Sequence, residues 1–487
     1  MFLGLVREFS PELVWCVESS IQRLSKEHKS VFAALSVLSA ACGGSFDQNL
    51  VHALLGQEQQ KFSRAALHQL HSKLTIILFR ILIAVSIVVV KLPRLIHVSG
   101  ESIIDMNASS GTFTMHDLML KCATALYSMA KTDLDFQQQY CKKKLHERLK
   151  DYMLGFLKAE TCRVISSGSL HELNKSDAHR MLLTYLLDIT IETSRAEHNI
   201  LIEGRHVVRK IMAAQLRLSR YYPLLKQLLE EMTDSQTPAH ACMLALCYME
   251  ISVAEMEMDD YAAARSHLEK VFHLLHVDCT LQEPPQEHNA VVAEAFLYYA
   301  VCLDNLPGDH QQTHLTLACL KLSRQIFKHL ADCAEAAGDA EAQGQQVSLR
   351  SQEASVLMQM SSHLFGYWKE INSEMDCIGG SSVRNSPSTA ADASAKALAA
   401  FDEALAVQHT CIKLRESLRQ YDTLNMSLAL LHHSNLLAAA GDIARALEAA
   451  RKADGIMRAL LGPDHRQALQ STMHLAKLYA SELHDHR

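Results

Sequence analysis

The sequence has few of the residues that interrupt helices. Its 487 residues include only 18 glycines and 9 prolines, whereas Ala, Leu, Gln, Glu, Lys and Met, which favour helices, are abundant. Since 48% of the residues are hydrophobic, a chain of this length can bury more than one core, in about two to four domains. We therefore predict a mainly α fold with long helices joined by short turns.

Positive charge is also scarce. The 47 basic residues face 54 acidic ones, for a net charge of −7, which gives no general attraction to nucleic acid or anionic lipid. Glu147 interrupts the basic run Lys142–Lys150, so this run is typical of a solvated helix face. Arg7 and Glu8 break an N-terminal apolar run that is too short for a signal peptide. We expect a cytoplasmic protein that does not bind nucleic acid.

Paired metal-ligand spacings are absent among the 13 cysteines. Four of the cysteines lie inside helical patterns, as reduced core residues do: Cys242, Cys247, Cys302 and Cys319. His432 and His433 are adjacent, and adjacent residues point about 100° apart on a helix, so they cannot chelate one ion. We predict no metal site.

Catalytic motifs are missing as well. The sequence contains no Gly-x-Ser-x-Gly elbow, no His-Glu-x-x-His helix and no Gly-x-x-x-x-Gly-Lys-Ser/Thr phosphate loop. No carboxylate pair lies in a recognisable catalytic context. The prediction is a protein without catalytic residues or cofactors, and therefore not an enzyme.

One long apolar run stands out, "LTIILFRILIAVSIVVV" at residues 74–90. It approaches the shortest length that spans a bilayer, about 17 to 25 residues, but Arg80 near its middle costs roughly 2.5 to 3.5 kcal/mol on insertion. Its β-branched residues also fit buried strands. Two interpretations stay open: an apolar insertion over 74–98, or a membrane tether through 74–90.

Residues 1–130 have the pattern of a small mixed domain. Phe32, Leu35, Leu38 and Ala41 form one helical stripe, glycines at 43 and 44 end that helix, and Asp47 is expected to cap a new helix. Further on, "ESIIDMNASSGTFTMHD" predicts a β-hairpin around the turn-forming run 107–111. The next helix is predicted to begin at residue 117.

This order of helices and hairpin, together with Met115-His116-Asp117, resembles the winged-helix domain of STAND signalling ATPases, in particular NB-ARC proteins with their "MHD" signature. The resemblance implies that His116 contacts the β-phosphate of bound ADP and that Asp117 supports it as a helix cap. Because the chain has no phosphate loop, we expect its nucleotide-binding domain to be missing and His116 to be a vestigial nucleotide sensor. A natural short form and an incomplete gene model both remain open.

Residues 131–232 are predicted to be helical throughout. "RMLLTYLLDITIETSRAEHNILIEG" has leucines at core spacing before a glycine stop. The run "AEHNIL" at 196–201 resembles the helical arm that follows the winged helix in the same family. We therefore expect a helical arm over 131–232.

From residue 238 to 487 the pattern becomes pairs of helices. A tight turn is expected at Met258–Asp260, and a second hairpin turns at Gly441-Asp442. This alternation resembles tetratricopeptide repeats, in which each helix hairpin buries one face against its neighbour. "LLGPDH" followed by "LAKLY" resembles the longer repeats of kinesin light chains. The resemblance implies a tetratricopeptide α-solenoid.

Two divergent hairpins are expected between these, over 287–336 and 343–416. The second contains "CIGGSSVRNSPSTAADAS", residues 377–394, whose Gly, Ser, Pro and Ala content predicts a flexible loop. Ser386 precedes a proline there. It is interpreted either as a phosphorylation site or as part of an unmodified surface loop.

A stack of hairpins offers a curved surface on which a protein or peptide ligand is held by many weak contacts. His432, Asn435, Arg445 and Lys477 are the predicted partner-binding groups at its rim. We expect a non-catalytic interaction module, the regulatory or sensor part of a STAND-type signalling protein. The alternative is a free-standing tetratricopeptide adaptor or scaffold similar to kinesin light chains, with a membrane-tethered form as a further variant.

Overall fold

The structure is a computed structural model of the chain. It describes residues 26–42, 45–47, 50, 53–54, 104–107, 112–115, 123–124, 127–128, 141–167, 182–183, 185–186, 205–214, 218–233, 238–279, 289–307, 310–338, 340–380 and 387–485. The predictions for His116, Asp117, Ser386 and the apolar segment 74–98 lie outside these residues.

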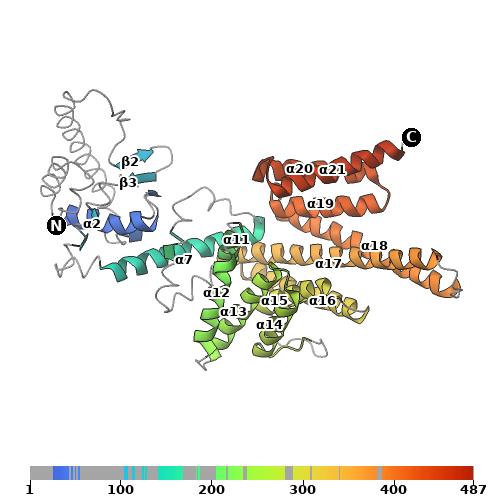
Figure 1. The fold of residues 1–487 in the computed structure, drawn as a ribbon, viewed down its shortest axis with the longest axis horizontal. Coiled ribbons are helices and arrows are strands. Elements are labelled where there is room, and N and C mark those ends of the chain that lie inside the picture. Colours follow the sequence, from blue (N-terminus) through green and yellow to red (C-terminus); the bar gives the residue numbers. More distant parts are fainter. Residues whose placement is uncertain are drawn as a thin grey trace. The chain divides into compact units, whose positions relative to one another are not determined.

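The described chain is mainly helical and forms two compact units (Figure 1). The first comprises 1–158 with 171–203, and the second 159–170 with 204–487. Helix α7 (Lys142–Ser167) begins in the first unit and ends in the second. Each described helix is too short or too polar to cross a lipid bilayer.

The first unit contains helix α2 (Lys26–Ala41) and a small antiparallel sheet. The expected hairpin is present, with β2 (Ile104–Asn107) beside β3 (Thr112–Met115). Strand β1 (Ser45–Asp47) pairs with the other edge of β3, which gives the order β1-β3-β2. The expectation that Asp47 caps a helix is wrong, because its backbone pairs with Thr112 in the sheet.

The core of the first unit follows the predicted stripe. Leu35, Leu38 and Ala41 are buried along α2, so the face read from the sequence is the packed one. Arg148 of α7 donates from Nη1 to the carbonyl oxygen of Leu54 at 3.0 Å. The buried side of α7 repeats every turn and consists of Leu145, Leu149, Met153 and Leu157.

The second unit is a succession of helices that pack against their neighbours in the chain. It begins with α11 (Arg205–Ala214) and α12 (Leu218–Thr233). Although the sequence placed these two with the helical arm, their contacts group them with the hairpins. The hairpins follow as α13 (Pro238–Met256) with α14 (Tyr261–Leu274), α15 (Ala290–Asn305) with α16 (His310–Ala337), α17 (Ala340–Gly380) with α18 (Pro387–Ser417), and α19 (Leu424–Ala439) with α20 (Ile443–Leu461), before the final α21 (Arg466–Asp485).

The first and last hairpins turn in the same way. Asp259 and Gly441 adopt left-handed backbone angles, with φ of 62° and 81°. The next residue is an aspartate in both cases, and its backbone N–H bonds a carbonyl five residues earlier at 2.9 Å, which is the Schellman ending of a helix. The side chains of Asp260 and Asp442 then cap the second helix, each accepting a backbone N–H at 3.2 Å.

Aromatic and aliphatic side chains fill the spaces between hairpins. Phe272 of α14 packs against Phe296 of α15 with ring centroids 4.7 Å apart and meets Tyr299 edge-on at 5.4 Å. Further along, Phe365 of α17 stacks on Trp368. Helix α17 runs between α16 and α18 (Figure 1), so it contributes to the cores on both sides.

Two expectations need correction. The loop predicted over 377–394 is largely helical, since α17 continues through Gly380 and α18 begins at Pro387. A proline suits the first turn of a helix, and the alanines after it favour helix, so only 381–386 are left between the two. The predicted burial of four cysteines holds for Cys247, Cys302 and Cys319, whereas Cys242 is exposed.

Candidate functional site

Helix α11 is joined to the first helices of three hairpins by a buried network of charged groups. Glu294 of α15 lies 3.3 Å from Nη2 of Arg205 and 3.6 Å from Nε2 of His206, and it accepts from the Gln352 amide of α17 at 3.0 Å. Glu250 of α13 lies 3.5 Å from Nε of Arg205. Carboxylates on α13 and α15 therefore contact the basic side chains of α11.

Electrostatics keep these groups ionised although they are buried. Burial raises the pKa of the Glu294 carboxyl, but the neighbouring Arg205, His206 and Arg209 outweigh this effect, and the pKa lies well below its usual value. Burial lowers the pKa of Arg205, but Glu294 and Glu250 raise it by more, so the pKa lies above its usual value. Buried carboxylates and guanidinium groups in such contact stabilise each other's charged forms.

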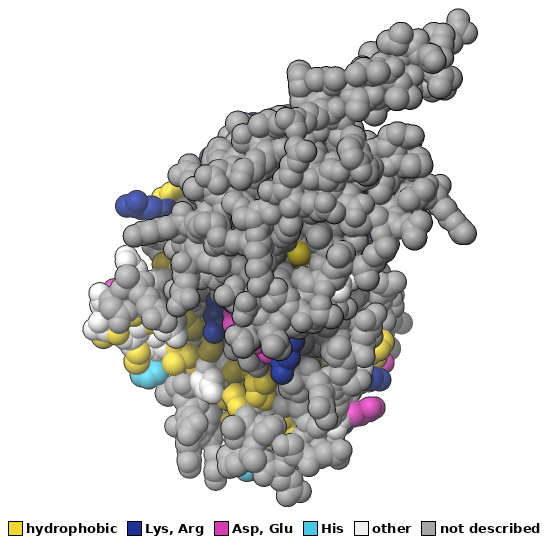
Figure 2. Space-filling model, turned by 90° about the vertical axis from the view of Figure 1, so that its left-hand side faces the viewer, with side chains coloured by type: hydrophobic (Ala, Val, Ile, Leu, Met, Phe, Trp, Pro, Cys, Tyr) yellow, Lys and Arg dark blue, Asp and Glu magenta, His cyan; other side chains and the backbone are white. Residues whose placement is uncertain are grey.

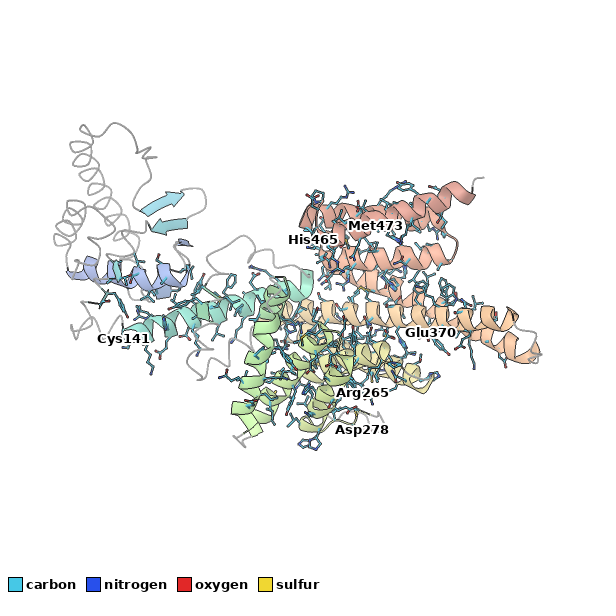
Figure 3. All side chains as sticks on the ribbon, viewed as in Figure 1. Cys141, Arg265, Asp278, Glu370, His465 and Met473 are labelled. Carbon is cyan, nitrogen blue, oxygen red and sulfur yellow. The ribbon has the colours of Figure 1, made fainter. Side chains whose placement is uncertain are left out.

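Further along the same helices lies a polar cavity of about 90 Å³ between α15, α16 and α17. Its polar lining includes Asp304, Gln312, Thr316, His363 and Glu370. Glu370 extends from α17 (Figure 3) and is solvent-exposed. The cavity is therefore open to solvent on the side of an acidic residue.

The imidazole of His363 is held at both nitrogens. Its Nδ1 lies 2.5 Å from Oδ1 of Asp304, and its Nε2 lies 3.2 Å from the carbonyl oxygen of Thr313. A carboxylate and a carbonyl can only accept hydrogen bonds. The ring therefore lies between two acceptors, which fix its orientation in the cavity wall.

A second arrangement recurs where successive first helices meet. Ser361 of α17 donates to the carbonyl of Ala404 at 2.9 Å and lies 3.0 Å from Nε2 of His432 on α19. Ser434 of α19 likewise donates to a carbonyl of α20 at 2.8 Å and lies 3.0 Å from Nε2 of His474 on α21. The two histidines are 42 positions apart, from 432 to 474, so the same contact recurs one hairpin later.

These serine-histidine pairs do not have the geometry of a hydrolytic dyad. A serine hydroxyl has one hydrogen, and Ser361 gives it to a carbonyl that can only accept. His432 must therefore donate from Nε2, whereas a general base must accept the serine proton. Ser361 and Ser434 are also fully buried, so these pairs lock helices together.

The four predicted rim residues occupy different environments. Asn435 on α19 and Lys477 on α21 are both exposed and stand 42 positions apart, so they occupy equivalent places on successive first helices. Arg445 is exposed on the second helix α20, where it pairs with Asp442 at 3.5 Å. His432 is half-buried and bound to Ser361, as described above. Their contact with a partner stays a prediction.

Charges of both signs appear on the face that Figure 2 draws, among the hydrophobic side chains of described residues.

Within the described part of the chain, no three His, Cys, Asp or Glu side chains are grouped so as to hold a metal ion. The predicted nucleotide sensor, His116, is not among the described residues, so its role stays a prediction.

The sequence did not single out the charged network or the cavity. One signal was available, because Glu250 and Glu294 each stand within the apolar runs "CYMEISV" and "VVAEAFL". A lone carboxylate in a buried helix face requires a partner. Nothing comparable marks Asp304 or His363, which come together from separate helices.

Comparison with known proteins adds no relationship. No protein-family model matches this chain, and the comparison with curated proteins gives no match.

Proposed function

We propose that this chain is a non-catalytic, cytoplasmic interaction protein whose hairpins form a tetratricopeptide-type stack that binds a protein or peptide ligand. The recurrence of one serine-histidine contact between successive first helices carries the proposal. A unit that repeats its inter-hairpin contact builds an extended surface, as stacked helical repeats do. The shared turn at Asp260 and Asp442 supports the same interpretation.

The N-terminal unit is proposed to be a winged helix, as the STAND resemblance implies. Helix α2 precedes β1, and the hairpin β2-β3 places β3 in the centre of the sheet. In this proposal the repeats sense a ligand, and the winged helix relays binding to a nucleotide domain that is not part of this chain. His116 would then be inactive as a sensor within this chain.

A free-standing adaptor similar to kinesin light chains is the second candidate. The specific support is the spacing of 42 positions, which also separates the helix caps Thr423 and His465. Thr423 accepts the backbone N–H of Met426 at 3.1 Å, and His465 accepts that of Gln467 at 3.3 Å. This spacing exceeds the ~34 residues of ordinary tetratricopeptide repeats and fits the longer type.

The test is a selection of displayed random peptides on the immobilised full chain. We expect sequences that bind the folded chain and not a heat-unfolded sample. A photo-crosslinker on these peptides should label the first helices α13, α15, α17, α19 or α21. Failure to select any peptide, or labelling confined to the first unit, would contradict the proposal.

Nucleotide binding separates the two candidates from an active ATPase. The chain is expected to neither hydrolyse ATP nor bind ADP, because it has no phosphate loop. ADP binding that is lost in His116→Ala would contradict the assignment as a non-catalytic module.

A further inference from the structure

We propose that the cavity between α15, α16 and α17 binds the guanidinium or ammonium head group of a ligand side chain. The inference rests on the proposed function, because it names the chemistry that the hairpin stack recognises in its protein or peptide ligand. The ligand would therefore place a basic side chain, arginine or lysine, in this cavity.

The size of the cavity selects a side-chain head group. Its volume is about 90 Å³, whereas sites for small molecules and cofactors measure about 300 to 1,000 Å³. A water needs only about 10 to 15 Å³ of such space. The cavity is therefore too small for a nucleotide and large enough for the few heavy atoms at the end of an arginine or lysine.

Three side chains in the lining that carry hydrogen-bond donors, His363, Thr316 and Gln312, have partners within the protein. Both ring nitrogens of His363 are engaged, Nδ1 with Asp304 and Nε2 with the carbonyl of Thr313. The hydroxyl of Thr316 donates to the backbone carbonyl of Gln312 at 2.9 Å. The side-chain amide of Gln312 donates to two carbonyls at the C-terminal end of α15, at 2.5 Å and 3.1 Å.

Two carboxylates in the lining can still accept hydrogen bonds from a ligand. Asp304 has a second carboxylate oxygen beside the one that meets His363, and Glu370 contributes a further carboxylate on the solvent side. A carboxylate accepts several hydrogen bonds and donates none. Because the lining has two carboxylates and no arginine or lysine, it keeps a net negative charge. Such a lining fits a ligand that donates and is positive.

The same two helices already hold basic side chains elsewhere. Glu294 of α15 and Gln352 of α17 meet at the site where Arg205 of α11 is bound. Asp304 lies ten positions further along α15, about 15 Å at 1.5 Å per residue. An internal arginine thus occupies one acidic position on α15, and the cavity is a second one with no arginine or lysine among its lining residues.

Gly366 forms part of the cavity wall inside the helix α17. A Cβ atom added there would meet nothing within 4 Å, so the fold does not need a glycine at this place. A larger side chain can therefore begin at this position without a clash at its Cβ, and it reduces the space in the cavity without changing any charge.

The experiment measures how the full chain binds immobilised pools of short randomised peptides with arginine, lysine or citrulline fixed at the centre. Citrulline has the shape of arginine without its charge. We expect retention of the arginine and lysine pools to exceed that of the citrulline pool roughly tenfold or more, as for hydrogen bonds between charged groups. The preference should disappear in Asp304→Asn with Glu370→Gln.

Two further variants control for charge and for folding. Asp402→Asn with Glu416→Gln makes the same charge change at exposed positions of α18 and should keep the preference. Gly366→Leu should lose it, although the charge is unchanged. Thermal unfolding of each variant, followed by circular dichroism, verifies that the chain is folded.

The outcomes separate this inference from the proposed function. Equal binding of arginine and citrulline pools, or full binding by Gly366→Leu, overturns the cationic cavity and leaves peptide binding intact. If the wild-type chain retains none of the pools, the proposed function fails together with the inference.

Discussion

The half-buried imidazole of His432 should make the C-terminal hairpins sensitive to acid. Burial lowers the pKa of His432 from 6.5 to about 4, although the contact with Ser361 raises it. The folded ring is therefore neutral at pH 7. In the unfolded chain the ring is solvated and takes up a proton at higher pH, so this contribution to stability is lost as the pH falls from 6.5 towards 4.

The size of the effect follows from the two pKa values, 6.5 and about 4. At pH 5 most unfolded chains carry the proton on this histidine and most folded chains do not. The linkage relation then gives a loss of roughly 2 kcal/mol relative to neutral pH. The neutral ring meets the aromatic ring of Phe365 edge-on at a centroid distance of 6.1 Å.

Trp368 provides a local probe, because it stacks on Phe365 with ring centroids 5.4 Å apart. Urea unfolding would be followed by its fluorescence in a Trp15→Phe background at pH 7.5 and pH 5. The comparison is with His432→Gln, whose amide can donate to Ser361 but does not titrate. We expect the parent to lose roughly 2 kcal/mol more than this variant between the two pH values.

His314→Gln serves as the control, since His314 is exposed on α16. It should show the same pH dependence as the parent. The same pH dependence in the parent and in His432→Gln would refute the reasoning, because it would mean that the folded His432 ring takes up its proton as readily as the unfolded one.

Three other changes test the packing directly. Glu294→Gln should destabilise the second unit by about 3 kcal/mol, measured by urea unfolding, because it removes one of the two carboxylates beside the buried Arg205 and leaves only Glu250. Gly441→Ala should lower the free energy of unfolding by about 1 to 2 kcal/mol, because Gly441 has a left-handed φ. Asp259→Gly at the equivalent turn should not lower it. Equal effects of the two changes would argue against a shared turn. Gly455→Ala should raise stability by about 0.5 to 1 kcal/mol, since the added Cβ meets open space, and a loss would contradict that geometry.

The turns of the hairpins could be predicted from the sequence because the residues that form them are neighbours in the chain. The turn expected at Met258–Asp260 is present, and its left-handed residue is followed by a capping aspartate. The β-hairpin flanking 107–111 was likewise marked by short alternating runs on both sides of a turn. Such features depend on neighbours in the chain, which is why periodicity and turn chemistry are enough to find them.

Strand β1 shows where local signals end. Ser45–Asp47 follows two glycines and looks like the start of a helix, with Asp47 as its cap. In the structure this segment pairs with β3, more than sixty positions later, from 47 to 112. A strand this short has no alternation of its own, so only its distant partner decides its conformation.

The prediction of a loop over 377–394 was wrong because composition does not decide between coil and helix there. Its glycines, serines and proline suggested flexibility, but a proline suits the first turn of a helix and the alanines after it favour helix. Helix α18 therefore begins inside the expected loop, and its buried residues Ala397 and Ala400 lie just beyond that segment.

The candidate site depends on pairings that no single helix encodes. Glu294 looks like an anomaly in an apolar run until Arg205 is brought to it from α11, and Asp304 needs His363 from α17 in the same way. A buried carboxylate in a helical run predicts that some cation must come near, since an unpaired charge is costly there. It does not say which one. The sequence can thus point to Glu294 as a residue to explain, while Asp304, which is partly exposed, leaves no such mark. If Asp304 does hold a ligand cation, the partner that would have explained it lies in another molecule.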